Sequence, residues 1–461
     1  MAKYRIVKKL GKGGNGTVYK VVDAQGNFFA KKILNRKASP KNYQRFKDEI
    51  EVLYSLNDRK GVIEIIESYL PKKITESNKA FYIMPLATTL KEHIQDLDDE
   101  TIIKLVIKLC DGLLYLHSRG ITHRDIKPDN ILVVDGEPVF SDFGLANFPK
   151  KKRISNLDEK IGPYWTIAPE MKRISSTSEY KKADIYSFAK TVWMILAKEW
   201  KSFDGQYIPD SNISLNNYVD LIINRTRMGG VWNYESLVLL DRLLINATNN
   251  NPSERPSAIQ FKEQFEFWYT SNLDYTLRNI YEWEDALSKI FPVSIPVSCT
   301  WEKPEAILQV LKILFERYDN LNHAFYPRGG GMDFEKIEIY ELEELLLINR
   351  DVVLKPKILI FESMNSYDWS YFRLEVDEIE PVFTDNISEF EERLFVLPDG
   401  RYSEIETDET VEYSRFFKGS FVITNKMSKI NQLSGRYNAY SGLHNKHSNS
   451  EYKVILTELM K

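Results

Sequence analysis

Two acids and an amide at close spacing are the residues of this sequence that point most directly to chemistry. They are Asp125 and Asn130, within the segment His-Arg-Asp-Ile-Lys-Pro-Asp-Asn at 123–130, and Asp142, which opens Asp-Phe-Gly. An aspartate can accept or orient the proton of a hydroxyl, and carboxylate and amide oxygens are hard ligands that suit Mg²⁺. Phosphoryl transfer requires these two services and little covalent chemistry. The alternative is a polar loop with this spacing by coincidence, and the flanking sequence disfavours it.

These two motifs resemble the catalytic loop and the metal-binding motif of eukaryotic-type protein kinases. The resemblance implies that Asp125 orients or deprotonates the substrate hydroxyl and that Lys127 contacts the transferring phosphoryl group. It also implies that Asn130 and Asp142 hold Mg²⁺, with Mn²⁺ as an alternative. In the family, a lysine at the place of Lys127 accompanies specificity for serine and threonine. Arg124, beside the catalytic aspartate, predicts control by phosphorylation of the activation segment, because a partly buried arginine favours an anion.

A turn rich in glycine lies near the N-terminus. Gly11, Gly13 and Gly16 form a G-x-G-x-x-G pattern, which lets backbone amides approach phosphate without a side chain in the way. Dinucleotide-binding folds use the same pattern, but there a helix follows it. Here the hydrophobic alternation predicts strands at 4–10, 19–23 and 28–34, so a strand follows the glycines. The order of elements therefore favours the kinase interpretation.

Two adjacent lysines follow on the third predicted strand. The family has a lysine in the pattern Val-Ala-Ile-Lys, and this chain reads Phe-Ala-Lys-Lys at 29–32. Since side chains alternate between the two faces of a strand, only one of the two lysines can face the nucleotide. The Ala-x-Lys spacing from Ala30 selects Lys32, and Lys31 is then a solvated charge.

A helix is predicted at 41–57 because Phe46, Ile50 and Leu53 recur on one stripe. In the family, a glutamate on this helix pairs with the strand lysine and orients it toward the phosphates. Glu49 fits that role best by its place beside the apolar stripe. Glu51 is the alternative.

Residues 80–86 read as the last strand of the small lobe. By resemblance, Met84 guards the back of the adenine pocket, and the hinge follows it. Pro85 has no backbone N–H, so the hinge donor is expected from Ala87. The residues expected to contact the nucleotide are Gly11, Gly13, Gly16, Val18, Ala30, Lys32, Met84, Ala87, Asn130 and Asp142.

The rest of the large lobe is expected to be helical. Residues 101–118 have a helical apolar period and are predicted to carry the catalytic loop. A second apolar helix begins near Asp184, whose counterpart in the family holds the backbone of that loop. Glu170 of Ala-Pro-Glu and Arg255 match a structural ion pair of the family. Their joint presence predicts a complete large lobe.

The activation segment at 145–170 holds two candidate phosphosites, Ser155 and Thr166, with Ser155 preferred. One departure from the family lies in the same segment. The family has Gly-Thr ahead of Ala-Pro-Glu, and its threonine touches the catalytic aspartate and lysine. The equivalent pair here is Gly162-Pro163, which leaves the geometry of substrate docking open.

Composition limits the alternatives. The chain has 461 residues, 43% hydrophobic and 28% charged, with a net charge of −4 and a pI near 6.0, which gives no electrostatic argument for a nucleic-acid partner. The two cysteines, Cys110 and Cys299, are too few and too far apart for a disulfide framework or a zinc site. No signal peptide or membrane-spanning run is evident. We therefore expect a soluble, cytoplasmic protein.

Residues 271–461 contain no motif that we can place. We predict helices at 275–290, 304–318 and 334–348. Strands are predicted at 357–361, 371–376, 394–397, 416–424 and 452–456, and a polar loop rich in Gly, Ser and Asn at 434–450. The region is too apolar to be disordered, so we expect a mixed α/β accessory domain.

The predicted fold class is therefore α+β, with a bilobal protein kinase fold at 1–270 (small lobe 1–87, large lobe 88–270) and an accessory domain at 271–461. The resemblance implies a serine/threonine kinase that uses ATP and Mg²⁺ and acts on proteins, with the chain itself as one candidate substrate. The alternatives are a nucleotide-binding pseudokinase scaffold and a small-molecule kinase of related fold. The polar residues that a pseudokinase usually lacks are present here, and the Ala-Pro-Glu segment favours a protein substrate.

Overall fold

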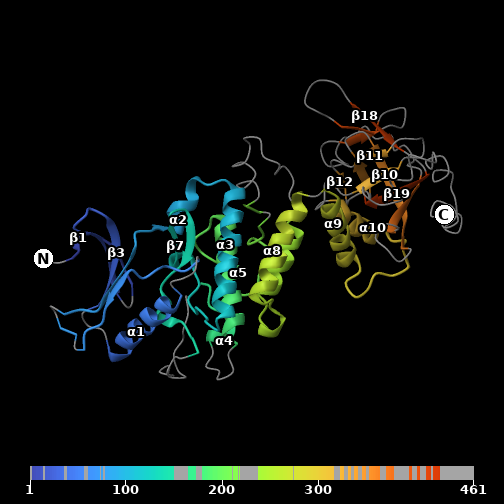
Figure 1. Cartoon of the computed structure of the whole chain (residues 1–461). Helices are drawn as coiled ribbons and strands as arrows, with labels where there is room; N and C mark the ends of the chain where they lie inside the picture. Colours follow the sequence, from blue (N-terminus) through green and yellow to red (C-terminus); the bar gives the residue numbers. More distant parts are fainter. Residues whose placement is uncertain are drawn as a thin grey trace. The chain divides into compact units, whose positions relative to one another are not determined.

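The chain forms two compact units, Met1–Leu273 and Asp274–Lys461 (Figure 1). The computed structural model describes residues 3–13, 16–35, 39–56, 61–72, 74–75, 78–149, 165–172, 179–209, 211–215, 217–218, 237–273, 275–315, 322–325, 331–333, 337–340, 345–348, 352–363, 370–377, 394–396, 402–404, 412–416 and 419–425. The described helices include none that is both long and apolar enough to cross a membrane.

The first unit begins with an antiparallel sheet of five strands in the order β1-β2-β3-β5-β4. The strands are β1 Arg5–Lys12, β2 Gly16–Val22, β3 Phe28–Leu34, β4 Glu67–Tyr69 and β5 Phe81–Pro85. β3 coincides with the strand predicted at 28–34, and its burial alternates from Phe29 to Leu34. Ala30, Lys32 and Leu34 are buried, whereas Lys31 is only partly so. The period of two thus puts Lys32, and not Lys31, on the inner face.

Helix α1 (Pro40–Ser55) packs against this sheet (Figure 1). Ser39 caps it by accepting a hydrogen bond from the backbone N–H of Asn42 (3.2 Å), and Pro40 begins the first turn, where its missing N–H has no consequence. The buried face carries Phe46 and Leu53 together with Glu49. A carboxylate is therefore held inside an otherwise apolar contact surface.

The rest of the first unit is mainly helical. Its helices are α2 Leu90–His93, α3 Asp99–Ser118, α4 Pro169–Lys172, α5 Tyr180–Ala197, α7 Val238–Ala247 and α8 Ala258–Leu273. Asp98 caps α3, and α3 contacts both α5 and α8. The unit also contains a small sheet of β6 (Thr88–Thr89), β7 (Ile131–Val134) and β8 (Glu137–Phe140), and four short 3-10 helices are described. These are η1 Ile94–Asp96, η2 Pro128–Asn130, η3 Phe143–Leu145 and η4 Pro252–Glu254.

Residues 61–63, which follow α1 in the sequence, contact α3 and β8 closely. Gly61 lies so near Gly112 of α3 that a Cβ on Gly61 would come within 2.9 Å of the Gly112 Cα, and its φ of +89° also favours glycine. Two backbone hydrogen bonds add to this contact. Ile63 N–H donates to the Phe140 carbonyl (3.0 Å), and Phe140 N–H donates to the Gly61 carbonyl (2.9 Å). Residues 61–63 are therefore joined to both α3 and β8.

The second unit combines two described helices, α9 Tyr275–Ile290 and α10 Pro304–Phe315, with a mixed sheet. Its strands are β9 Ser298–Trp301, β10 Asn322–Phe325, β11 Gly331–Asp333, β12 Ile337–Tyr340, β13 Leu345–Ile348, β14 Val352–Ser363, β15 Ser370–Asp377, β16 Leu394–Val396, β17 Tyr402–Glu404, β18 Glu412–Phe416 and β19 Gly419–Asn425. The aromatic core includes Trp283 of α9 with Phe361 and Phe372 of the sheet. The mixed α/β content agrees with the sequence prediction.

The helix predicted at 334–348 was wrong. The structure has two strands there, β12 and β13, and β13 pairs with β14 so that Leu346 lies opposite Leu354. Leu342, Leu345 and Leu346 satisfy a helical period, but Ile337 to Ile339 alternates, and pairing with β14 decides the outcome. The strand predicted at 452–456 and the loop at 434–450 lie outside the described residues.

Candidate active site

Asp184 holds the backbone of the catalytic loop from the first turns of α5. Its carboxylate is 1% exposed and accepts hydrogen bonds from the N–H groups of His123 and Arg124, each at 2.8 Å. His117 Nε2 lies 3.1 Å from the same group. Arg124 has a φ of +65°, a strained conformation for a residue other than glycine. Charge-assisted bonds to two successive amides stabilise that conformation.

His123 joins the catalytic loop to the segment that carries Asp142. Its ring Nδ1 accepts a hydrogen bond from Asp125 N–H (3.3 Å), so its Nε2 carries the proton and donates to the Ser141 carbonyl (2.9 Å). The ring is fully buried and lies 4.6 Å from the Phe143 ring. A histidine fixed in this way supports the geometry of the loop and does not act as a proton shuttle.

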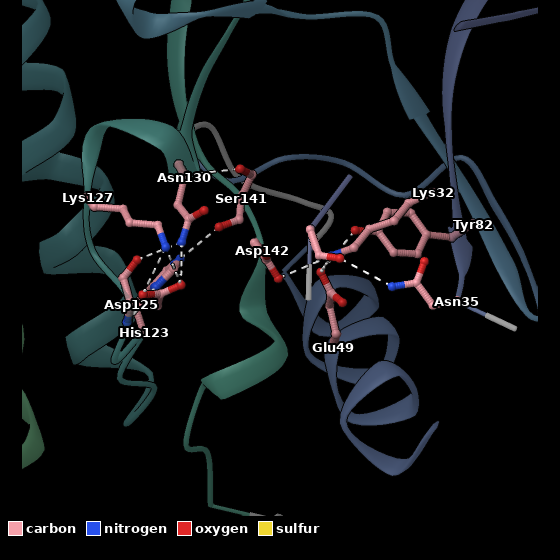
Figure 2. A network of polar contacts seen from close by, with 11 residues as sticks. Lys32, Asn35, Glu49, Tyr82, His123, Asp125, Lys127, Asn130, Ser141 and Asp142 are labelled. Atoms are coloured by element: carbon pink, nitrogen blue, oxygen red, sulfur yellow. Dashed lines mark hydrogen bonds and ion pairs between the residues drawn. The ribbon is translucent and has the colours of Figure 1, made fainter. Parts of the chain in front are cut away.

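Asp125, Lys127 and Asn130 meet at one point (Figure 2). Lys127 Nζ lies 3.2 Å from Asp125 Oδ2, and Asn130 Nδ2 donates to the same oxygen at 2.7 Å. Ser141 secures Asn130, because both its N–H (2.8 Å) and its hydroxyl (3.0 Å) donate to the Asn130 carbonyl. Burial raises the pKa of the Asp125 carboxyl, and the Lys127 ammonium partly opposes this shift. The loop thus presents one carboxylate oriented by two neighbours.

Lys32 belongs to the five-stranded sheet, and its contact with Asp142 links that sheet to the catalytic loop. In Figure 2, Asp142 lies between the side chains around Asp125 and those around Lys32. Lys32 Nζ is 2.7 Å from Glu49 Oε1 and 3.1 Å from Asp142 Oδ1. Burial favours the neutral amine, but the adjacent carboxylates outweigh it and hold the pKa of Lys32 well above its usual value. Lys32 in turn lowers the pKa of Asp142. The site therefore holds a permanent cation beside an ionised carboxylate.

Tyr82 of β5 completes this cluster and was not singled out in the sequence. It lies directly opposite Lys32 in the β3–β5 register, and its buried hydroxyl donates to Glu49 Oε1 at 2.9 Å. Glu49 Oε2 is buried with no hydrogen-bond partner among the described residues. The period of two could have put Tyr82 and Met84 on one face. The contact between Tyr82 and Glu49 could not be predicted from the sequence pattern, because 33 residues separate them.

Asn130 and Asp142 have the donor atoms that Mg²⁺ prefers. The side-chain amide nitrogen of Asn130, Nδ2, makes both hydrogen bonds to Asp125, so the side-chain oxygen Oδ1 is the atom left for a metal. The Asp142 side chain is 42% exposed and ionised. Within the described ranges there is no group of three or more His, Cys, Asp or Glu side chains that could hold a metal. The residues fit a Mg²⁺ ion that takes its other ligands from phosphate and water, as Mg²⁺ commonly does.

The predicted wall of the adenine pocket lies on neighbouring strands. Ala30 and Met84 are opposite one another in the β3–β5 register and both are buried. Val18 of β2 lies opposite Lys32. Ala87 follows β5 and is partly exposed. The strand register thus brings Val18, Ala30 and Met84 close to Lys32, where the sequence predicts the adenine pocket.

Gly16 and Asn35 shape the glycine-rich turn. A Cβ on Gly16 would lie 2.9 Å from the Ile33 carbonyl oxygen of β3, so only glycine fits there, whereas Gly11 has open space around it. Asn35 Nδ2 donates to the Gly13 carbonyl (3.2 Å), and Thr17 donates to Asn35 Oδ1 (3.1 Å). Asn35 thus joins the end of β3 to the turn, although it belongs to no motif recognised in the sequence.

The activation segment is described at 145–149 and again from residue 165 onward. Ser155 and the Gly162-Pro163 pair lie outside the described residues, so Ser155 stays a prediction. Thr166 is 1% exposed, and its hydroxyl donates to the Ile126 carbonyl (2.9 Å) in the catalytic loop. A buried, bonded hydroxyl cannot be reached by a kinase. The structure therefore argues against Thr166 as a phosphosite and gives it a contact to the catalytic loop instead.

Arg255 and Glu170 join the end of the activation segment to the helical core. The Arg255 side chain is fully buried, and its two terminal nitrogens lie 2.6 and 2.9 Å from the two Glu170 oxygens. Its Nε also donates to the Asn249 carbonyl (2.7 Å). Such a bidentate pair depends on the planar fork of arginine.

We expect Arg255→Ala to lower the free energy of unfolding by about 3–5 kcal/mol, because removal of one partner leaves the Glu170 charge without its counter-ion. Urea unfolding monitored by tryptophan fluorescence would measure this change. Lys262→Ala is the matched control, since Lys262 and Asp111 form a more exposed pair at 2.6 Å, for which a change of at most about 1 kcal/mol is expected. Equal losses in the two variants would contradict the structural role of Arg255.

The antiparallel sheet with its buried lysine–glutamate pair, joined to a helical part that carries the catalytic loop, defines a protein kinase domain. A family model described as "Protein kinase domain" matches residues 4–265, and the chain belongs to this family. It is 30% identical over 264 residues to Calcium-dependent protein kinase 5 of Plasmodium berghei, an overlap of 54% of this chain and 42% of that protein. It is 28% identical over 263 residues to an LRR receptor-like serine/threonine-protein kinase of Arabidopsis thaliana, with 54% and 43% covered. The chain thus spans less than half the length of these relatives.

Proposed function

We propose that the chain is a serine/threonine protein kinase that uses ATP and Mg²⁺. One observation carries the proposal. Lys32, Asp125 and Asp142, which the sequence selected for three different tasks, lie together: Lys32 contacts Asp142, and the adjacent Ser141 is hydrogen-bonded to Asn130, which donates to Asp125 (Figure 2). The relative from Arabidopsis thaliana is a serine/threonine-protein kinase, which supports this class.

In the proposed reaction, each polar group has one task. Asp125 accepts the proton of the substrate hydroxyl or orients it, and Lys127 places a positive charge beside the transferring group. Lys32, held by Glu49, positions the phosphates of the nucleotide. Asn130 and Asp142 would hold Mg²⁺, which when bound neutralises charge on the phosphates. The raised pKa of Asp125 brings it nearer to the range in which a carboxylate can take a proton.

Incubation of the full chain with γ-labelled ATP, Mg²⁺ and generic protein substrates tests the proposal. Label on serine or threonine of a protein, the chain included, is the expected result. Label only on small hydroxyl compounds would indicate a small-molecule kinase. Measured ATP binding without any labelled product would instead favour a pseudokinase scaffold. That alternative has less support, because all the polar residues of the reaction are present.

Regulation by phosphorylation of the activation segment is a further part of the proposal. The Arg124 guanidinium lies 4.4 Å from the Tyr180 ring, near the catalytic loop. A phosphate on the segment would provide an anion for this arginine. Phosphosite mapping after incubation with ATP should find Ser155, and a map without any site at 145–170 would contradict this part.

For residues 274–461 we propose a role in substrate recruitment or in sensing a signal, because a folded unit follows a complete kinase domain. Truncation after Leu273, with retained ATP binding as the check of folding, should narrow the range of proteins phosphorylated. An unchanged range would count against recruitment.

A further inference from the structure

Tyr82 contacts helix α1 at two points one turn apart. Its hydroxyl donates to Glu49 Oε1 at 2.9 Å, and its ring lies 5.5 Å from the ring of Phe46. Both partners are on the buried face of α1, and Tyr82 itself is 1% exposed. A side chain with two rotatable bonds and two fixed contacts has little freedom to move. Tyr82 thus fixes both the position and the rotation of the helix relative to β5.

Lys32 alone cannot hold Glu49 and helix α1 in place. Its ammonium group already contacts two carboxylates, Glu49 at 2.7 Å and Asp142 at 3.1 Å. In the proposed reaction the phosphates of the nucleotide are a third anion that attracts it. The Tyr82 hydroxyl is neutral, so phosphate does not draw it away electrostatically. Glu49 therefore keeps one donor that does not depend on the nucleotide.

We infer that Tyr82 is a positioning residue of the proposed kinase reaction, which holds Glu49 and helix α1 in place while Lys32 serves the nucleotide. The inference rests on the proposed function and adds a residue to it. The hydrogen bond to a carboxylate is charge-assisted and lies in a buried site, where such bonds are strong. Its loss would leave Glu49 with a single donor, because Oε2 has no hydrogen-bond partner within the described part of the chain.

The charged state of Glu49 provides a second readout. The titratable groups that face it are Lys32 of β3, Tyr82 of β5 and Asp142 after β8. Burial raises the pKa of the Glu49 carboxyl, and the hydrogen bonds from Lys32 and Tyr82 lower it in part. Without the Tyr82 hydroxyl this pKa rises further. Glu49 would then become protonated at a higher pH. Any loss of kinase activity that acts through the charge of Glu49 must therefore grow as the pH falls.

Tyr82→Phe removes only the hydroxyl, and we expect it to lower kcat/KM by about tenfold at pH near 8. The defect should widen as the pH is lowered toward about 6, for the reason given above. In a Glu49→Ala background the same substitution should change kcat/KM by less than about twofold, because both oxygens that could accept the hydrogen bond are gone. The assay is the labelled-ATP assay on the full chain.

Tyr69→Phe is the matched control. Tyr69 lies on β4 of the same sheet, and its hydroxyl donates to Asn78 Oδ1 at 2.7 Å, a contact that does not involve Glu49. Its loss should leave kcat/KM unchanged. The inference is overturned if Tyr82→Phe matches the parent, or if it costs the same factor with and without Glu49. A parent chain without kinase activity would instead reject the proposed function.

Discussion

Asp142→Asn is expected to lower kcat by about a thousandfold or more. The substitution keeps the size of the side chain but removes the negative charge that Mg²⁺ binding requires. Metal stabilisation of transition-state charge is worth several kcal/mol, and about 4 kcal/mol corresponds to a factor of a thousand. The Asp142 side chain is exposed and also contacts Lys32 at 3.1 Å, so the charge is lost at the centre of the site. Phosphoryl transfer from γ-labelled ATP at saturating Mg²⁺ measures the effect.

Asp135→Asn provides a control with the same chemical change in the same backbone conformation. Asp135 is exposed in the turn between β7 and β8, and its φ of +51° resembles the +60° of Asp142. Asparagine tolerates this left-handed region well. Any strain effect of the substitution would therefore occur in both variants. Near-normal activity of Asp142→Asn would refute its metal role.

Lys32→Ala should reduce kcat/KM by a similar factor, because it removes the charge proposed to position the phosphates and leaves Glu49 buried with one donor fewer. The raised pKa of Lys32 means that this charge is present across the neutral range. In the folded protein the ammonium is lost only above that raised pKa. We therefore expect no change in the relative defect between pH 6 and 8. Steady-state kinetics at varied ATP concentration would measure it.

Lys31→Ala is the neighbouring control. Lys31 lies on the other face of β3, with its ammonium 3.6 Å from the centre of the Phe81 ring. Its removal should leave kcat/KM within about twofold of the parent, as is usual for surface substitutions. If Lys31→Ala and not Lys32→Ala abolished turnover, the choice between the two lysines would be reversed.

Much of the kinase domain could be predicted because its signals are local. The alternation at 28–34 predicted β3 with the bounds that the structure has, and the Ala-x-Lys spacing selected Lys32, which lies on the buried face. The stripe of Phe46, Ile50 and Leu53 identified α1, whose limits differ by one or two residues from the prediction. The motifs at 123–130 and 142–144 could be recognised from their residue types and spacing alone. The family assignment followed from them.

The remainder depended on contacts between residues distant in the chain. In the sequence, Tyr82 cannot be distinguished from other tyrosines on strands, and its role follows only from its hydrogen bond to Glu49. Asn35 is likewise an ordinary polar residue after a strand, and only the structure shows its hydrogen bond to the Gly13 carbonyl. Thr166 was interpreted by its place in the activation segment, whereas its hydroxyl is bonded to the catalytic loop. At 337–348 the sequence satisfied two periods, and only pairing with β14 distinguished them.

The close contact of Gly61 with Gly112 limits how α1 can move. The two backbone bonds beside it hold Gly61 and Ile63, and only four residues separate Gly61 from Leu56 at the end of the helix. This short length of chain limits how far that end can travel while the bonds are kept, so a displacement of Glu49 is expected to be mainly a tilt about it. The opposite end, near Pro40, then moves farthest, and such a tilt strains the hydrogen bond from the Tyr43 hydroxyl to the Pro71 carbonyl. A binding partner that pushes on the first turn of α1 would therefore gain the greatest leverage over the Lys32–Glu49 pair.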